Sequence, residues 1–199
     1  MNAATRESAP LSMRSLGVVL LVCGGLGFAA ATVLTVEKFW LLTNPFYTPS
    51  CSINATFSCG SVMTSPQAEV FGFPNPLLGI AGFAVITTTG LALLAGGRFA
   101  SWYWAGLQVG VTAAVVFVHW LIIQSVFVIG ALCPYCMVVW AVTIPAFVYV
   151  TLQNLAQYQH QLPRRGRAVA GFVLRQHSAL LAVWLLALTA LVVTSTLLA

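Results

Sequence analysis

The segment CPYCMVVWAVTIPAFVYVTL, residues 133–152, joins a pair of cysteines to an uncharged apolar run. A helix needs about 20 residues to cross a bilayer, so this segment is long enough to span one. Pro134 follows the first cysteine, and proline suits the first turn of a helix because an N–H group there has no partner. The segment therefore predicts a membrane helix that begins at a C-x-x-C pair.

The whole chain has the composition of an integral membrane protein. Of its 199 residues, 60% are hydrophobic and 6% are charged, whereas soluble domains carry about 25% charged residues. Its apolar runs are too long for the strands of a membrane β-barrel, in which apolar and polar residues alternate over segments of about ten residues. Five runs reach bilayer length: Leu16–Val36, Leu77–Ala95, Trp104–Val128, Cys133–Leu152 and Ala179–Leu198. The sequence thus predicts an all-α integral membrane protein with five spans.

The basic residues predict the orientation of these spans. With the N-terminus in the cytoplasm, Lys38 alone falls outside and the arginines fall inside: Arg6, Arg14, Arg98, Arg164, Arg165, Arg167 and Arg175. This is the bias expected of membrane proteins. It accounts for the net charge of +5 without a nucleic-acid partner. The large loop between the first two spans, the C-x-x-C pair and the C-terminus are then expected on the extracytoplasmic side.

Cys133 and Cys136 have the spacing of a redox-active pair. Cysteines in C-x-x-C motifs have depressed thiol pKa values, and the positive end of a helix favours a thiolate. A thiolate attacks a disulfide or an electrophilic ring. An inert staple is the alternative, but a disulfide that closes so short a loop adds little stability through chain entropy. We therefore predict redox chemistry at this pair.

A second pair, Cys51 and Cys59, lies in the first polar loop. The loop is rich in Ser, Thr, Asn and Gly, so we expect it to be exposed and mobile. Alone, the pair fits a single structural disulfide of an exported loop. Next to a C-x-x-C pair on the same face, it also fits exchange through a mixed disulfide. Zinc is the third possibility, but the spacing is loose for a zinc site, and we expect no metal.

Other polar or reactive residues near the spans have simpler interpretations. Cys23 lies in the middle of the first run and is expected to be a packing residue. His119 lies inside the third run, where an ionisable residue is a functional candidate. We expect its neutral imidazole to bond to a neighbouring helix. Glu37 and Lys38 are expected to form a solvated pair at the membrane interface.

The order of these motifs resembles the vitamin K epoxide reductase family, especially bacterial members of the actinobacterial type. The resemblance runs from Leu16 to Leu152 and rests on Cys51, Cys59, Ser65, Phe71-Gly72-Phe73-Pro74-Asn75 and Cys133-Pro134-Tyr135-Cys136. It implies a four-helix transmembrane bundle around a quinone. We therefore expect this bundle in residues 1–152, a basic cytoplasmic linker in residues 153–178, and a fifth transmembrane helix in residues 179–199.

The resemblance implies a catalytic role for each of the four paired cysteines. Cys51 would exchange with a reduced, exported DsbA-like protein of thioredoxin fold. Cys59 would pass the electrons to Cys133 through an interloop disulfide. Cys136 would be the thiolate next to the quinone.

The same resemblance implies a set of quinone-binding residues: Asn75, Ser65, Phe71, Phe73, Tyr135 and Trp140. Asn75 matches the position at which the family places an amide that bonds a quinone carbonyl. Trp140 replaces the tyrosine that vertebrate members use for the second quinone oxygen. Epoxide reduction is therefore not expected, whereas plain quinone reduction is.

Together these features predict an oxidoreductase that acts on sulfur groups with a quinone as acceptor. It would lie in a bacterial inner membrane and reoxidise the DsbA-like protein, with menaquinone favoured over ubiquinone. This partner is expected to be a separate chain, because the sequence ends at Ala199, after the fifth span. Two alternatives stay open. One is a non-enzymatic membrane scaffold braced by structural disulfides, and the other is a DsbB-type oxidase, which has its C-x-x-C pair in the first outer loop.

Overall fold

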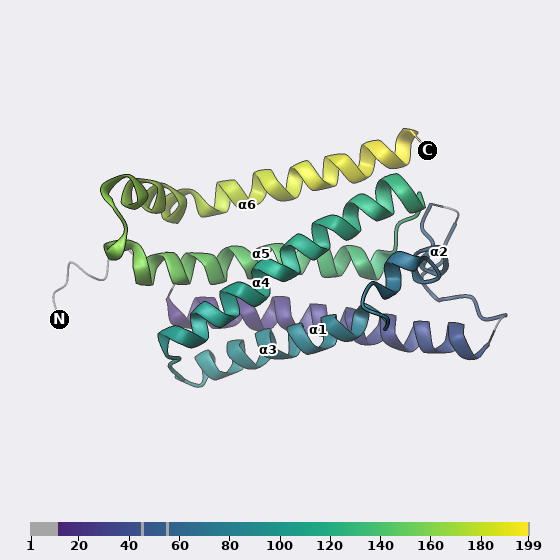
Figure 1. Cartoon of the computed structure of the whole chain (residues 1–199), viewed down its shortest axis with the longest axis horizontal. Helices are drawn as coiled ribbons and strands as arrows, with labels where there is room; N and C mark the ends of the chain where they lie inside the picture. Colours follow the sequence, from purple (N-terminus) through teal and green to yellow (C-terminus); the bar gives the residue numbers. More distant parts are fainter. Residues whose placement is uncertain (1–11, 45, 55, 199) are drawn as a thin grey trace.

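The computed structural model describes residues 12–44, 46–54 and 56–198, and most of them are helical (Figure 1). The α-helices are α1 (Met13–Thr43), α2 (Cys59–Met63), α3 (Pro76–Leu94), α4 (Ser101–Ile123), α5 (Pro134–Tyr158) and α6 (Arg164–Leu198). Two short 3-10 helices, η2 (Pro66–Glu69) and η4 (Gln159–Gln161), lie between them. A π-helical turn, η3 (Gln124–Ile129), continues α4.

Five of these helical segments are long and apolar enough to cross a membrane. They begin at Met13, Pro76, Ser101, Pro134 and Arg164. The prediction of an all-α membrane protein is therefore confirmed. Each predicted run matches one of the five segments, apart from single end residues at Ala95, Cys133 and Leu198.

The helices extend beyond the apolar runs into polar sequence. α1 continues past Val36 to Thr43, and α6 begins at Arg164 instead of Ala179. Hydropathy marks only the part of a helix that hydrocarbon requires, whereas Arg, Ala and Leu favour helix wherever they stand. The segment 153–178 is consequently largely helical, with a break between Gln159 and Pro163. Its role as a cytoplasmic linker stays a prediction.

The first four long helices form a bundle, and the fifth lies along one side of it. α1 packs against α3 and α5, α4 packs against α5, and α6 also contacts α5. Figure 1 shows α6 on the side of the bundle that faces away from α1 and α3. The short helix α2 lies at the end of the bundle where α5 begins. Both cysteine motifs are therefore at the same end of the molecule.

Glycine allows α1 and α3 to approach each other closely. A Cβ atom added to Gly24 of α1 would lie 2.5 Å from Thr87 Oγ1 and 2.9 Å from the Thr87 Cα of α3. Helices in membranes associate largely through such close packing of small residues. Gly25, the next residue along, has nothing within 4 Å of the same position. The two glycines therefore differ in what a larger side chain would meet.

We predict that Gly24→Leu destabilises the bundle, whereas Gly25→Leu does not. Forcing a side chain into a packed interface costs about 1–3 kcal/mol. Thermal unfolding in detergent should show a lower Tm for Gly24→Leu and a Tm near that of the wild type for Gly25→Leu. Equal Tm values for the two variants would mean that the α1–α3 packing is not as close as the structure has it.

His119 of α4 connects the bundle to α6. Trp184 Nε1 donates to His119 Nε2 at 3.0 Å, and His119 Nδ1 lies 2.7 Å from the carbonyl oxygen of Val115. An indole nitrogen only donates and a carbonyl only accepts. His119 Nε2 therefore accepts from Trp184, and Nδ1 donates to the Val115 carbonyl. The prediction that His119 bonds to a neighbouring helix is confirmed, and Cys23 is confirmed as a residue of the apolar core.

Candidate active site

The loop cysteines form a disulfide that is buried. Cys51 and Cys59 are bonded to each other, with relative exposures of 6% and 0%. Cys59 is the first residue of α2, which is capped by Ser58: its Oγ accepts the N–H of Ser61 at 3.3 Å. The expectation of an exposed pair is thus wrong. Hydropathy describes the loop as polar, but it does not report that the loop folds back over the bundle.

The C-x-x-C pair stands at the start of α5 as predicted. Cys133 and Cys136 are free thiols. Cys133 is the N-cap residue, immediately before the span Pro134–Gln161, and its Sγ accepts the N–H of Cys136 at 3.4 Å. Pro134 occupies the first turn. A hydrogen bond from the Cys136 side chain lowers the pKa of Cys133 against the opposing effect of burial, and the N–H groups of Cys136 and Tyr135 add to this lowering.

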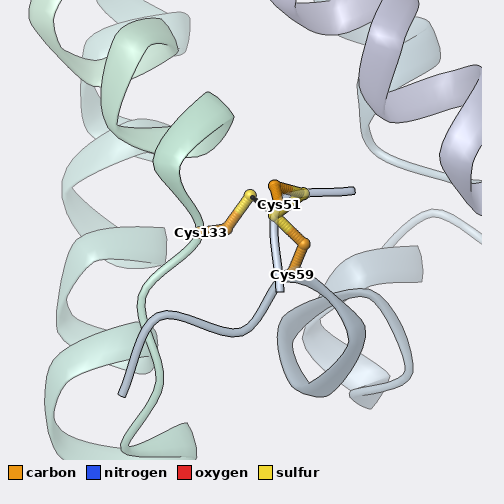
Figure 2. Close-up of side chains that lie close together, drawn as sticks. All are labelled: Cys51, Cys59 and Cys133. Carbon is orange, nitrogen blue, oxygen red and sulfur yellow. Dashed lines mark hydrogen bonds between the residues drawn. A yellow bond between two sulfur atoms is a disulfide. The ribbon is translucent and has the colours of Figure 1, made fainter. Parts of the chain in front are cut away.

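The two cysteine pairs touch through one pair of sulfur atoms. Cys59 Sγ lies 3.0 Å from Cys133 Sγ, and Figure 2 shows the Cys133 side chain directed at the disulfide. Cys59 has no hydrogen because its sulfur is bonded to Cys51, so a proton in this contact belongs to Cys133. A thiol in contact with a disulfide is the arrangement that precedes thiol–disulfide exchange.

Backbone hydrogen bonds hold the two segments in this position. Ser58 N donates to Leu132 O at 3.0 Å, and Leu132 N donates to Thr56 O at 2.7 Å. Phe57 and Leu132 form a short parallel bridge, two residues before Cys59 and one residue before Cys133. Nothing in the local sequence predicts this pairing, because it joins residues that are far apart in the chain.

The sulfurs of Cys51, Cys59 and Cys133 all lie within 4.8 Å of one another. The three sulfurs are close enough together to bind one metal ion, but a cysteine binds a metal as a thiolate. The disulfide uses two of the three sulfurs. The expectation that the protein binds no metal stays a prediction.

A cavity of about 710 Å³ lies inside the bundle beneath these cysteines. Its wall is formed by α1, α2, α3, α4, η3, α5 and the segment between α2 and α3, and it is almost wholly apolar. Cys136 is part of the wall. One thiol of the C-x-x-C pair therefore faces the cavity, while the other contacts the loop disulfide.

Four of the six predicted quinone-binding residues are in the cavity wall: Ser65, Phe71, Asn75 and Trp140. The other two lie elsewhere. Phe73 stacks on Phe71 with ring centroids 6.3 Å apart, and Tyr135 packs against the cysteine cluster. The structure thus brings the amide, the hydroxyl and two of the aromatic rings to one chamber. Their role in binding stays a prediction.

The Asn75 side chain also closes the segment that roofs the cavity. Its Nδ2 donates to Gln67 O at 2.7 Å, and its Oδ1 accepts the N–H of Val70 at 3.2 Å. An amide nitrogen carries two hydrogens, and one of them goes to Gln67. Asn75 is therefore oriented by the backbone before any ligand binds.

Sequence reasoning missed Lys38, the one charged residue in the wall of this cavity among the described residues. Lys38 is 8% exposed and Glu37 is 6% exposed, so the expectation of a solvated interface pair is wrong for both. Lys38 Nζ contacts Met63 O and Glu69 Oε1, each at 2.7 Å. The only feature of the sequence that could have pointed to this role of Lys38 is its position at the end of an apolar run.

These features define a class: a multi-pass membrane protein with a cysteine redox centre above an apolar chamber. A sequence model of the Vitamin K epoxide reductase family matches residues 18–151. Because this match covers most of the chain, the protein belongs to that family. Family membership makes it a membrane thiol–disulfide oxidoreductase. A search of curated proteins found no match.

The sulfur contact predicts which mixed disulfide forms when the loop pair is broken. In Cys51→Ser, Cys59 loses its partner and has Cys133 as its nearest sulfur. We expect mild oxidation to produce a Cys59–Cys133 disulfide, identified by mass spectrometry of non-reduced peptides. Adding Cys23→Ser should leave the yield unchanged, because Cys23 is packed in the bundle core. A Cys59–Cys136 disulfide as the main product would contradict the geometry.

Proposed function

We propose that the protein is a quinone-dependent thiol oxidase that reoxidises an exported DsbA-like protein of thioredoxin fold. The observation that carries the proposal is the sulfur arrangement. Cys133 contacts the loop disulfide at 3.0 Å, and Cys136 belongs to the wall of the apolar cavity. The four cysteines thus form a continuous route from the loop to the bundle interior.

The exchange steps balance in atoms and electrons. A partner dithiol first reduces the Cys51–Cys59 disulfide. The Cys59 thiolate then attacks Cys133 in an oxidised Cys133–Cys136 pair: the Cys59–Cys133 bond forms, and Cys136 leaves as a thiolate. Cys51 next attacks Cys59, and Cys133 leaves with the bonding electron pair. Two electrons have then passed from the loop pair to the C-x-x-C pair.

The sulfur states of the structure match the end of this sequence. The loop pair is a disulfide, and Cys133 and Cys136 are both free thiols. The hydrogen bonds that lower the pKa of Cys133 stabilise it as the leaving thiolate of the last step. The same state is the one from which the C-x-x-C pair passes its electrons onward.

The cavity fits a quinone in size and chemistry. Ligand pockets of this kind measure about 300–1,000 Å³ and combine apolar walls with a few placed polar groups. A bound quinone supplies the electron acceptor, which takes two electrons and two protons from the dithiol. Asn75 and Ser65 are the polar groups of the wall that we assign to orientation of the ring, and Phe71 and Trp140 are assigned to contact with its faces. Menaquinone is favoured over ubiquinone only by the resemblance of the sequence to actinobacterial members of the family.

The arginine distribution supports a location for this chemistry. Both cysteine motifs lie at one end of the bundle (Figure 1), and the positive-inside bias assigns that end to the outside of a bacterial inner membrane. Disulfide exchange with an exported partner requires such an oxidising compartment. Cys51 is assigned to exchange with the partner: the partner thiolate attacks Cys51, and Cys59 leaves as the thiolate that continues the relay.

The proposal is tested by mixing purified protein with menaquinone and a reduced thioredoxin-fold dithiol protein under anaerobic conditions, following quinone absorbance. Cys133→Ala and Cys136→Ala should both fall to the uncatalysed rate, because each interrupts the relay. Cys51→Ala should stop turnover with the protein partner and spare small dithiols. Cys23→Ala is the control and should keep the wild-type rate. Wild-type turnover by Cys133→Ala would refute the relay.

A second prediction tests the cavity as the site of quinone reduction. Gly110 of α4 is in the wall, and a Cβ added to it meets nothing within 4 Å. In Gly110→Phe the ring should occupy the chamber without a backbone clash. A quinone that enters the cavity must displace this ring, at a cost of about 1–3 kcal/mol. We therefore expect kcat/KM for quinone to fall roughly ten- to a hundredfold.

The control for this experiment is Gly25→Phe, which adds the same ring on α1 at a position that is also open but outside the wall. It should leave quinone kinetics unchanged. The alkylation pattern of the cysteines should be that of the wild type in both variants. An unchanged kcat/KM in Gly110→Phe would place quinone reduction somewhere other than this cavity.

A further inference from the structure

Two adjacent residues at the outer end of α1 reach opposite flanks of the loop disulfide. Glu37 accepts three groups from the segment before Cys51: the Tyr47 hydroxyl at 2.8 Å, the Ser50 hydroxyl at 2.5 Å and the Ser50 N–H at 3.3 Å. Lys38 contacts the segment after Cys59, donating to Met63 O and pairing with Glu69, each at 2.7 Å. The Glu37 hydrogen bond raises the pKa of Tyr47.

The same helical face supports the sulfurs directly. Leu34, one turn before Glu37 and Lys38, is buried in a cluster with Cys51, Cys59, Met63 and Cys133, and Leu41, one turn after them, packs against it. Residues three and four apart share a helix face. The outer end of α1 is therefore a platform, with apolar contacts under the disulfide and one charge toward each flank.

Glu37 and Lys38 do not form an ion pair with each other. The only salt bridge among the described residues joins Lys38 to Glu69, while the Glu37 carboxylate is satisfied by hydroxyl and N–H groups. Buried charges are retained at a desolvation cost, so both side chains hold a defined position. Exchange depends steeply on position, because a displacement of about 1 Å can slow a reaction a hundredfold.

We propose that Glu37 and Lys38 are positioning residues for sulfur exchange. Glu37 fixes the segment that enters the loop disulfide, Lys38 fixes the segment that leaves it, and together they seat Cys59 Sγ against Cys133 Sγ. Neither residue touches the reacting sulfurs through its own polar atoms. The inference rests on the proposed function, since it concerns the first internal step of the same relay.

Graded variants test each side of the platform separately. Tyr47→Phe and Ser50→Ala each remove one hydroxyl from Glu37, and the double variant removes both. Glu69→Gln removes the ion pair of Lys38 but leaves an acceptor. Lys38→Met removes both contacts of Lys38, and Lys38→Arg is the conservative rescue. Thr64→Ala is the control, because the Thr64 hydroxyl bonds only to Gly60 and Ser61 of its own turn.

The first readout does not need a quinone. In a Cys51→Ser background, the rate at which the Cys59–Cys133 disulfide forms under a fixed oxidant reports how well the two sulfurs are seated. We expect it to fall roughly tenfold or more in the Tyr47→Phe/Ser50→Ala double variant and in Lys38→Met. It should stay at the background rate in Thr64→Ala and recover in Lys38→Arg. Equal rates in all variants would overturn the inference.

The second readout separates positioning from loss of fold. With a protein dithiol as donor, the double variant should lose kcat and keep the wild-type KM for quinone, because its changes lie outside the cavity wall. With a small dithiol that reduces the C-x-x-C pair directly, its rate should equal that of the wild type. An equal loss with both donors would indicate general destabilisation and contradict the inference. A wild-type protein that reduces no quinone would instead refute the proposed function and leave the first readout intact.

Discussion

The contact between the sulfurs of Cys59 and Cys133 is the constraint on which the rest of the structure depends. Exchange requires the sulfurs to meet at van der Waals range, and these two residues are 74 positions apart in the chain. Three separate elements supply the required precision: the bridge between Phe57 and Leu132, the N-terminal turn of α5, and the outer end of α1. The bundle thus holds the polar loop that carries Cys51 and Cys59 in a fixed position.

The chamber below depends on the same supports. α1 packs closely against α3 through glycine and against α5 through the apolar core, while α4 is joined to α5. Asn154 of α5 donates to Trp104 O at 3.1 Å, and Gln108 of α4 donates to Thr151 at 3.0 Å. These polar contacts fix α4 at the opposite end of the bundle from the cysteines. The space between the helices is left open where Cys136 faces it.

Much of this architecture is predictable from the sequence, since it follows from local patterns. Run length identifies the spans, and the position of Pro134 identifies the start of α5. The environment of His119 follows from the rule that polar groups in hydrocarbon find partners. The roles of Glu37 and Lys38 do not follow, because Glu37 bonds to residues 10 and 13 positions away and Lys38 to one 25 positions away. Phe73 and Tyr135 show the same limit: an aromatic residue in a motif can face the chamber or stand behind it, and only the tertiary fold decides.

The burial of both loop sulfurs has a consequence for selectivity. A disulfide shielded from solvent is hidden from the small thiols that diffuse past it, so its reduction begins with an unfavourable displacement of the covering chain. Every reductant meets this same barrier, but only a molecule whose surface complements the displaced loop offsets it with contacts of its own. Discrimination between reductants of the loop disulfide then arises before any sulfur is attacked.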